Sequence, residues 1–223
     1  MIRKVLPLAA ILAFTFSAAH AQENPVTALD KQLSRFDLGV SGVGIFNKAT
    51  SGPIVATGAE NTGQVVGNEP SKTLGALATL RYVAKPFVGL EFNYGFARYT
   101  ENFSNVPGIA PLIGVQTKVN EYTLGYLVTP AHPIFGYQPF ASVGAGTMEF
   151  APTPGGGLGF PTQARATYYY SLGLQREYFS EHFGFRAAFR QNFFLAPDYL
   201  TNYLTTLQHT TAYEPTIGFY LRF

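Results

Sequence analysis

Apolar and polar residues alternate through long stretches of this chain, and this period of two constrains the fold more than any other feature. Between residues 87 and 99 every second residue is large and apolar: Val88, Leu90, Phe92, Tyr94 and Phe96. Successive side chains of a strand point to opposite faces, so the pattern predicts a strand with one apolar face. Residues 73–82 repeat the pattern, and Ala84-Lys85-Pro86 predicts a tight turn that joins the two strands as a hairpin.

The same alternation predicts six further strands, which makes eight. Their approximate bounds are 36–47, 119–128, 138–148, 165–177, 183–193 and 209–223. The connections alternate in length: short ones lie near residues 84–86, 129–136 and 179–182, and long ones cover about 48–72, 100–114, 150–164 and 194–208. This arrangement is typical of outer-membrane barrels with periplasmic turns and extracellular loops. We therefore expect an all-β fold, a closed eight-stranded antiparallel up-and-down transmembrane β-barrel with both termini periplasmic.

Composition agrees with strands that face lipid. Outside the N-terminal region no apolar run reaches the roughly 18 residues that a transmembrane helix needs, although 47% of the chain is hydrophobic. Charged residues make up only 13% of the chain, about half the usual share, whereas Tyr, Phe and Gly are abundant. The chain has no Cys, which excludes a disulfide framework, a thiolate metal site and a Cys nucleophile.

Charged side chains are expected on the inward face, because a cation at the bilayer midplane of a barrel costs about 2–4 kcal/mol. On the predicted register ten of them point inward: Asp37, Arg81, Glu91, Glu121, Arg165, Glu177, Arg186, Arg190, Glu214 and Arg222. An eight-stranded barrel is just wide enough for side chains to fill, so these acids and arginines predict a lumen charge network. A narrow ion path is the alternative, which the equal numbers of acids and bases disfavour. Arg98 and Arg176 fall on the apolar face, but at strand ends, where the cost is about 0–1 kcal/mol.

The N-terminus predicts a cleavable signal peptide. Arg3 and Lys4 precede an apolar run over residues 5–16, and Ala19-His20-Ala21 suits cleavage after residue 21. Removal of residues 1–21 leaves 13 bases against 13 acids, so the basic isoelectric point gives no support to nucleic acid as a partner. We expect residues 22–34 to be a short periplasmic lead-in and residues 35–223 to be the barrel domain.

The C-terminus carries a further pattern, in which a polar residue, a Gly, an apolar residue and a final aromatic residue are spaced as Thr216, Gly218, Leu221 and Phe223. This ending resembles the C-terminal insertion signal of bacterial outer-membrane β-barrels. Together with the topology and the alternation, it makes the chain similar to the OmpA-like superfamily of small eight-stranded barrels.

That resemblance implies a fold rather than an activity. It implies insertion by the barrel-assembly machinery with periplasmic chaperones, contact with outer-membrane lipid and lipopolysaccharide, a monomer, and no cofactor. The expected function is a non-enzymatic structural or surface-interaction role through four extracellular loops, and any ligand of those loops stays open.

A soluble lipocalin-like carrier is the main alternative fold, since it also has eight strands and a secretory signal. Such a barrel needs a charged exterior around an apolar cavity, whereas the polar face here is rich in small residues such as Ser142, Gly144 and Gly146. Lysine is common on soluble exteriors. Here the lysines of the mature chain fall in turns, loops or strand ends: Lys31, Lys48, Lys72, Lys85 and Lys118.

A lipid-modifying enzyme, such as a lipid A deacylase-like hydrolase, is the second alternative. It would need His and Ser two residues apart at the outer rim. His132 and His182 fall in expected periplasmic turns, and His209 is followed by Thr210-Thr211 rather than by a Ser. His209 and Glu214 are the one pair worth testing. The histidines lack metal-ligand spacing, and the Gly-rich residues 155–159 match no phosphate-binding motif, so we expect no catalytic, cofactor or metal site.

Overall fold

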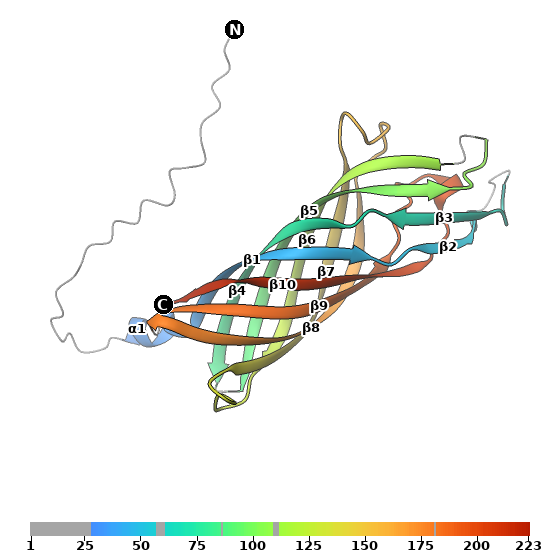
Figure 1. Cartoon of the computed structure of the whole chain (residues 1–223). Coiled ribbons are helices and arrows are strands. Elements are labelled where there is room, and N and C mark those ends of the chain that lie inside the picture. Colours follow the sequence, from blue (N-terminus) through green and yellow to red (C-terminus); the bar gives the residue numbers. More distant parts are fainter. Residues whose placement is uncertain (1–27, 57–60, 86, 109–111, 181) are drawn as a thin grey trace, which may run out of the picture.

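The computed structural model describes residues 28–56, 61–85, 87–108, 112–180 and 182–223, and these form a closed antiparallel barrel (Figure 1). Eight long strands make its wall: β1 Phe36–Asn47, β4 Thr73–Lys85, β5 Val88–Ser104, β6 Leu112–Val128, β7 Gln138–Pro152, β8 Gln163–Ser180, β9 Phe183–Leu195 and β10 His209–Arg222. Neighbours in sequence pair with each other, and β1 closes the barrel against β10. The predicted eight-stranded up-and-down fold is confirmed. The predicted signal peptide lies outside the described residues.

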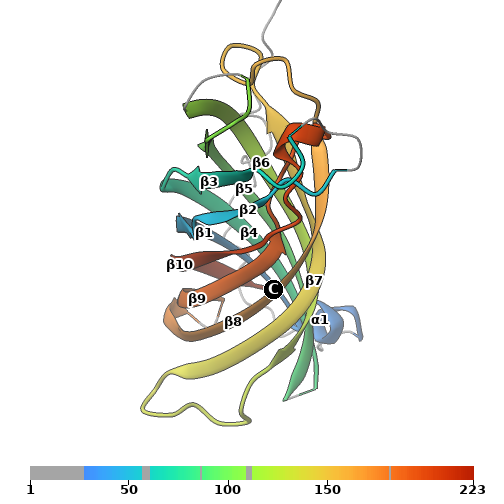
Figure 2. The ribbon, with the colours of Figure 1, turned by 90° about the vertical axis from the view of Figure 1, so that its right-hand side faces the viewer.

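The first long connection is not a plain loop. It contains β2 Thr50–Pro53 and β3 Val65–Pro70, which form a hairpin, and β3 pairs with the last residues of β5. In the end view of Figure 2 this hairpin lies on the same end of the barrel as the segment between β9 and β10, which contains a short 3-10 helix, Asn202–Leu204. The backbone N–H of Val55 donates to the carbonyl of Thr205 at 2.9 Å, which ties the two segments together.

The strands extend further toward this loop end than the sequence predicted. β5 and β6 pair over their full lengths, from Val88 with Val128 to Ser104 with Leu112. The apolar alternation ends earlier than the strand, because the outward residues in the last part of β5 are Arg98, Thr100 and Asn102. Hydrophobic periodicity reports the part of a strand that faces an apolar medium, whereas the hydrogen-bond ladder continues beyond it.

The outward face carries a continuous apolar surface, which we call the apolar belt. Its exposed residues include Leu38, Val40, Leu80, Leu90, Phe92, Tyr94, Phe96, Tyr122, Leu124, Tyr126, Val143, Tyr170, Leu172, Leu174, Phe185, Phe189, Ile217 and Phe219. Arg176 lies at its turn-side edge, and Arg98 and Lys118 lie at its loop-side edge. So large an exposed apolar surface marks contact with a membrane or a partner.

Besides the short 3-10 helix, the described residues form one α-helix. The lead-in contains α1 Ala28–Leu33, at the same end as the C-terminus (Figure 1). Among the described residues no helix has the length and the apolar content needed to cross a membrane.

Candidate functional site

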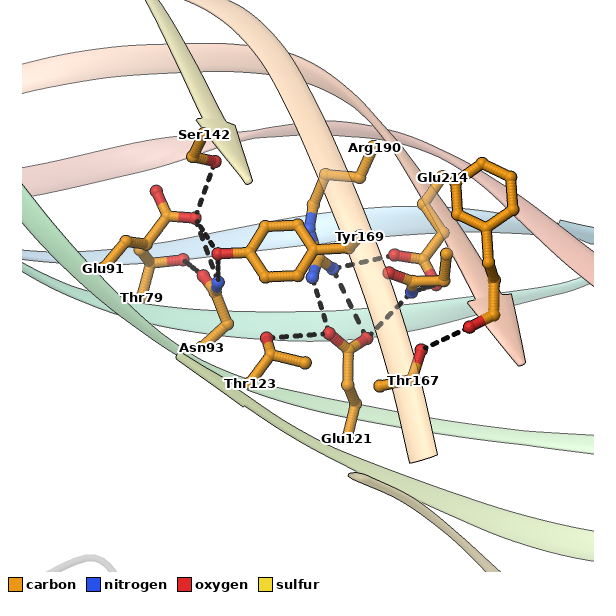
Figure 3. A network of polar contacts seen from close by, with 12 residues as sticks. Thr79, Glu91, Asn93, Glu121, Thr123, Ser142, Thr167, Tyr169, Arg190 and Glu214 are labelled. Carbon is orange, nitrogen blue, oxygen red and sulfur yellow. Dashed lines mark hydrogen bonds and ion pairs between the residues drawn. The ribbon is translucent and has the colours of Figure 1, made fainter. Parts of the chain in front are cut away.

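The middle of the barrel holds a polar network centred on Arg190 (Figure 3). Its guanidinium pairs with Glu121 at 2.6 Å and with Glu214 at 2.8 Å. Asn192 donates to the other oxygen of each carboxylate, at 3.1 Å and 2.9 Å. The ring of Tyr169 covers the guanidinium, with its centroid 4.9 Å away. All five side chains are buried. One arginine therefore stabilises two carboxylates that would otherwise repel each other, because water is absent to screen their charges.

A second part of the network surrounds Glu91. The guanidinium of Arg81 pairs with this carboxylate at 2.5 Å. Ser142, Tyr169 and Asn93 each donate to its other oxygen at 3.0 Å. Tyr169 therefore joins the two parts, because its hydroxyl bonds Glu91 while its ring covers Arg190. A buried carboxylate needs this many partners to stay charged away from water.

Toward the turn end, Arg186 pairs with Asp37 at 2.8 Å. Gln175 accepts hydrogen bonds from Arg186 at 3.0 Å and from Arg81 at 3.2 Å, which links this pair to Glu91. The ring of Phe140 lies beneath both guanidiniums, 4.0 Å from Arg81 and 5.8 Å from Arg186. The network thus runs across the barrel from the β1–β4 wall to the β8–β9 wall.

The predicted inward residues fall into three groups. Seven of the ten lie in the connected network: Asp37, Arg81, Glu91, Glu121, Arg186, Arg190 and Glu214. Glu177 and Arg222 pair with each other at the turn-side rim, with side chains 41% and 33% exposed, and are not part of the buried network. Arg165 lies nearer the loop end, where it pairs with Asp198 at 2.9 Å.

The loop-side half of the interior is filled by apolar side chains, which we call the apolar plug: Val43, Ile45, Ile54, Val66, Leu77, Ala97, Tyr99, Phe103, Val106, Ile113, Val115, Val119, Met148, Phe150, Phe194, Tyr199, Leu204 and Ala212. Residues from the strands, from the β2–β3 hairpin and from the β9–β10 segment all contribute. Phe160 stacks on Tyr199 with centroids 5.6 Å apart, and Phe150 packs on Phe194 at 5.7 Å. The sequence pattern does not predict this plug, because it indicates a polar inward face throughout.

Asp198 anchors the β9–β10 segment over the mouth. Its carboxylate accepts from Gln163 at 2.6 Å, and the side-chain oxygen of Gln163 accepts from the backbone N–H groups of Asp198 and Tyr199. Burial opposes ionisation of this carboxyl, but the Gln163 hydrogen bond and the charge of Arg165 outweigh it, so the pKa of Asp198 lies below its usual value. The Tyr199 hydroxyl bonds Thr117 at 2.7 Å. These contacts hold the plug in place from above.

Glu101 is an unusual member of the loop-side interior. It is 1% exposed and points inward at a level where the outward neighbours are the polar Thr100 and Asn102, beyond the apolar belt. Neither carboxyl oxygen has a hydrogen-bond partner among the described residues, and neither does the side-chain oxygen of the adjacent Asn68. Burial raises the pKa of Glu101 to about 8. The Asn68 side chain lowers this pKa by less than burial raises it, so the neutral form of the carboxyl fits this environment.

The cavities in the described part of the barrel do not form a continuous passage. A cavity of about 630 Å³ opens at the turn end, and Asp37, Gln175 and Tyr220 line it beside the network. The space between the network and the apolar plug, lined by Leu77, Tyr99 and Met148, measures about 20 Å³, which is room for roughly one water. The described side chains therefore divide the turn-end cavity from the loop end.

The catalytic candidates do not converge. On β10 His209 points outward and is exposed, whereas Glu214 points inward and is buried against Arg190. His182 lies at the turn-side rim, with Nδ1 3.0 Å from the carbonyl of Arg222, and His132 is exposed in the turn before β7. In the described ranges no three His, Cys, Asp or Glu side chains gather as metal ligands.

The residues of the C-terminal pattern have separate places on β10. Thr216 points inward and donates to the carbonyl of Ala188 at 3.2 Å, while Leu221 and Phe223 are exposed. Gly218 lies against β1, where an added Cβ would come within 2.1 Å of the Val40 carbonyl oxygen. A glycine is therefore required for the close contact that shuts the barrel, whatever else the pattern does.

Comparison with known proteins places the fold. No protein-family model matches the chain, and no curated protein matches it in sequence. Among solved structures it is similar to the outer membrane protein OprG from Pseudomonas aeruginosa, with 15% identity and a TM-score of 0.61 over 84% of this chain and 95% of that one. It is also similar to Neisserial surface protein A (NspA), with 12% identity and a TM-score of 0.51 over 84% of this chain and 97% of that one.

Proposed function

We propose that this chain, which has the fold of the small eight-stranded outer-membrane β-barrels, is a non-enzymatic integral protein of the bacterial outer membrane that acts through its outer wall and extracellular loops. Both termini would be periplasmic, because α1 and the C-terminus lie at the short-turn end (Figure 1). The mature protein would contact outer-membrane lipid and lipopolysaccharide. Periplasmic chaperones and the barrel-assembly machinery would deliver it, with Thr216, Gly218, Leu221 and Phe223 as the insertion signal.

The filled interior is the observation that carries this proposal. Ion pairs and hydrogen bonds occupy the middle of the lumen, and the apolar plug occupies its loop-side half. Such an interior stabilises the wall and leaves no described passage for a solute. A channel would need open space along the axis, and a soluble carrier would need an apolar cavity inside a charged exterior. What supports a surface role is the ordered loop end, where the β2–β3 hairpin and the β9–β10 segment are hydrogen-bonded together.

The apolar belt supports the membrane location. Every residue of the belt is on the outward face of a strand, while the seven charged residues of the network are inward. This polarity is the reverse of a soluble barrel and matches the lipid-facing surface of outer-membrane barrels.

Electrophoretic mobility tests the proposal. Outer-membrane fractions are extracted in detergent and compared with and without boiling. We expect a compact band that shifts only on heating, because a closed hydrogen-bonded barrel resists detergent until it is heated. Recovery of the protein in the soluble periplasmic fraction, without such a shift, would contradict the proposal and favour a lipocalin-like carrier.

A further inference from the structure

Two cationic side chains face each other on the outer wall. Arg98 of β5 and Lys118 of β6 are paired directly in register, and both are exposed. Where two charged residues are paired elsewhere in the described strands, an acid faces an arginine: Asp37 with Arg81 and with Arg222, Arg81 with Glu91, and Arg190 with Glu214. Like charges directly opposite each other on antiparallel strands are destabilising. Pairing within the barrel therefore gives no reason for Arg98 and Lys118 to face each other.

The pair lies at the loop-side edge of the apolar belt. Below it the outward residues are Phe96 on β5, and Asn120 followed by Tyr122 on β6, and beside it on β4 is Leu74, which is 82% exposed. Directly above it the outward residues are Thr100 on β5 and Gln116 on β6, both polar. A pair of cations at the edge of an exposed apolar surface is complementary to an amphipathic molecule that has an anionic headgroup above its acyl chains.

The position of Arg98 is fixed by its neighbours. Its Nη2 donates to the side-chain oxygen of Gln116 at 2.5 Å, and the same oxygen accepts from the Thr153 hydroxyl at 3.0 Å. The backbone N–H of Gln116 donates to the carbonyl of Gly156 at 2.9 Å. The connection after β7 thus holds Gln116, and Gln116 orients the guanidinium. This ordering reduces the entropy that Arg98 loses when it binds a ligand.

Neither cation is neutralised within the described part of the chain. None of the ion pairs there includes Arg98 or Lys118. The nearest acid in the register is Glu149 of β7, diagonal to Lys118, and its carboxylate accepts from Asn120 at 3.2 Å. Two exposed positive charges therefore stay available to an external anion.

We propose that Arg98 and Lys118 bind a phosphate group of the lipid A headgroup of lipopolysaccharide, with acyl chains against the belt below. The guanidinium fork matches two phosphate oxygens, and the lysine adds a second charge without a fixed geometry. The bound phosphate removes the repulsion between the two cations. This inference rests on the proposed function, because only an outer-membrane location with an outward loop end brings this wall beside lipid A.

Binding of lipid A to the purified, folded barrel in detergent tests the site by native mass spectrometry. The double variant Arg98→Gln/Lys118→Gln is expected to bind phosphorylated lipid A about 10- to 30-fold more weakly than the unmodified protein. Lys118→Gln alone should cause a smaller loss, and Lys118→Arg should retain binding. Arg176→Gln is the matched control, since Arg176 is an exposed cation at the opposite edge of the belt, beside the rings of Tyr137 and Tyr178, and it should leave binding unchanged.

Two control ligands, dephosphorylated lipid A and inorganic phosphate alone, separate the affinity due to the phosphate group from the affinity due to the acyl chains. Equal binding of dephosphorylated lipid A, or unchanged binding in the double variant, would overturn the phosphate site. If inorganic phosphate binds as tightly as lipid A does, the site is one for a free anion and not for lipid A. The heat-dependent mobility shift is measured on the same samples. Its absence in the unmodified protein contradicts the proposed function itself, whereas a folded double variant with undiminished binding contradicts the lipid A site alone.

Discussion

Replacement of Arg190 by methionine is expected to lower the free energy of unfolding of the barrel by about 3–5 kcal/mol. Methionine retains an unbranched stem like that of arginine but removes the positive charge between Glu121 and Glu214, whose carboxylates lie 2.6 Å and 2.8 Å from the guanidinium. Both acids would remain buried without a cation to pair with. The measurement is urea unfolding of the refolded protein in lipid vesicles, followed by the heat-dependent mobility shift because the chain has no Trp.

Two further variants isolate the charge from the packing. Addition of Glu121→Gln and Glu214→Gln to Arg190→Met should recover much of the lost stability, because the unpaired charges are then gone. Arg176→Met, at an exposed position, should change stability by only about 0.5 kcal/mol. An Arg190→Met barrel that unfolds at the same urea concentration as the unmodified protein would show that the network does not stabilise the fold.

A rise in pH from 6 to 9 is expected to destabilise the loop end of the barrel, and Glu101→Gln is expected to remove most of that dependence. The pKa of Glu101 is raised by burial to about 8 in the folded protein, from an ordinary value of 4.5. A raised pKa means that the folded state holds the proton more tightly than the unfolded state. The resulting stability is complete below about pH 4.5 and is lost as the pH rises through about 8. The groups around the carboxyl are neutral: Asn68 on β3, and Tyr99 and Tyr199.

Protease cleavage of the loop end, measured on the folded protein across this pH range, checks the prediction. The unmodified protein should become more susceptible at high pH, and Glu101→Gln should resist cleavage throughout. Glu69→Gln is the matched control, because Glu69 is a neighbouring acid of β3 whose side chain is exposed. Equal pH dependence in the Glu101→Gln and unmodified proteins would mean that this carboxyl does not control the loop end.

The sequence could predict the wall because an apolar surrounding, as in the proposed membrane location, imposes a simple rule on it. Each outward position of the belt must be apolar, so alternation appears in the sequence and locates eight strands. The same rule places charged residues inward, and there Arg81 pairs with Glu91, Arg186 with Asp37, and Arg190 with Glu121. Beyond Arg98 the outward residues of β5 are Thr100 and Asn102, so the loop-side continuation of this strand has no such pattern.

The partners inside the barrel could not be predicted in the same way. Which acid meets which arginine depends on the stagger of strands that are far apart in sequence, as for Asp37 and Arg186, which are 149 residues apart. Asp198 lies in the long connection predicted over residues 194–208, and this connection folds back to pair it with Arg165. The apolar plug arises because the hairpin β2–β3 and the β9–β10 segment cover the upper lumen, where inward side chains no longer meet a charged layer.

Conductance of the purified barrel in planar lipid bilayers at neutral pH tests the central claim most directly. A lumen filled by the network around Arg190 and by the apolar plug predicts no stepwise conductance above that of the bilayer, even at protein amounts at which the mobility shift shows folded barrel. Discrete conductance steps that grow in number with the amount of folded protein would contradict the sealed interior and make a narrow channel the better account.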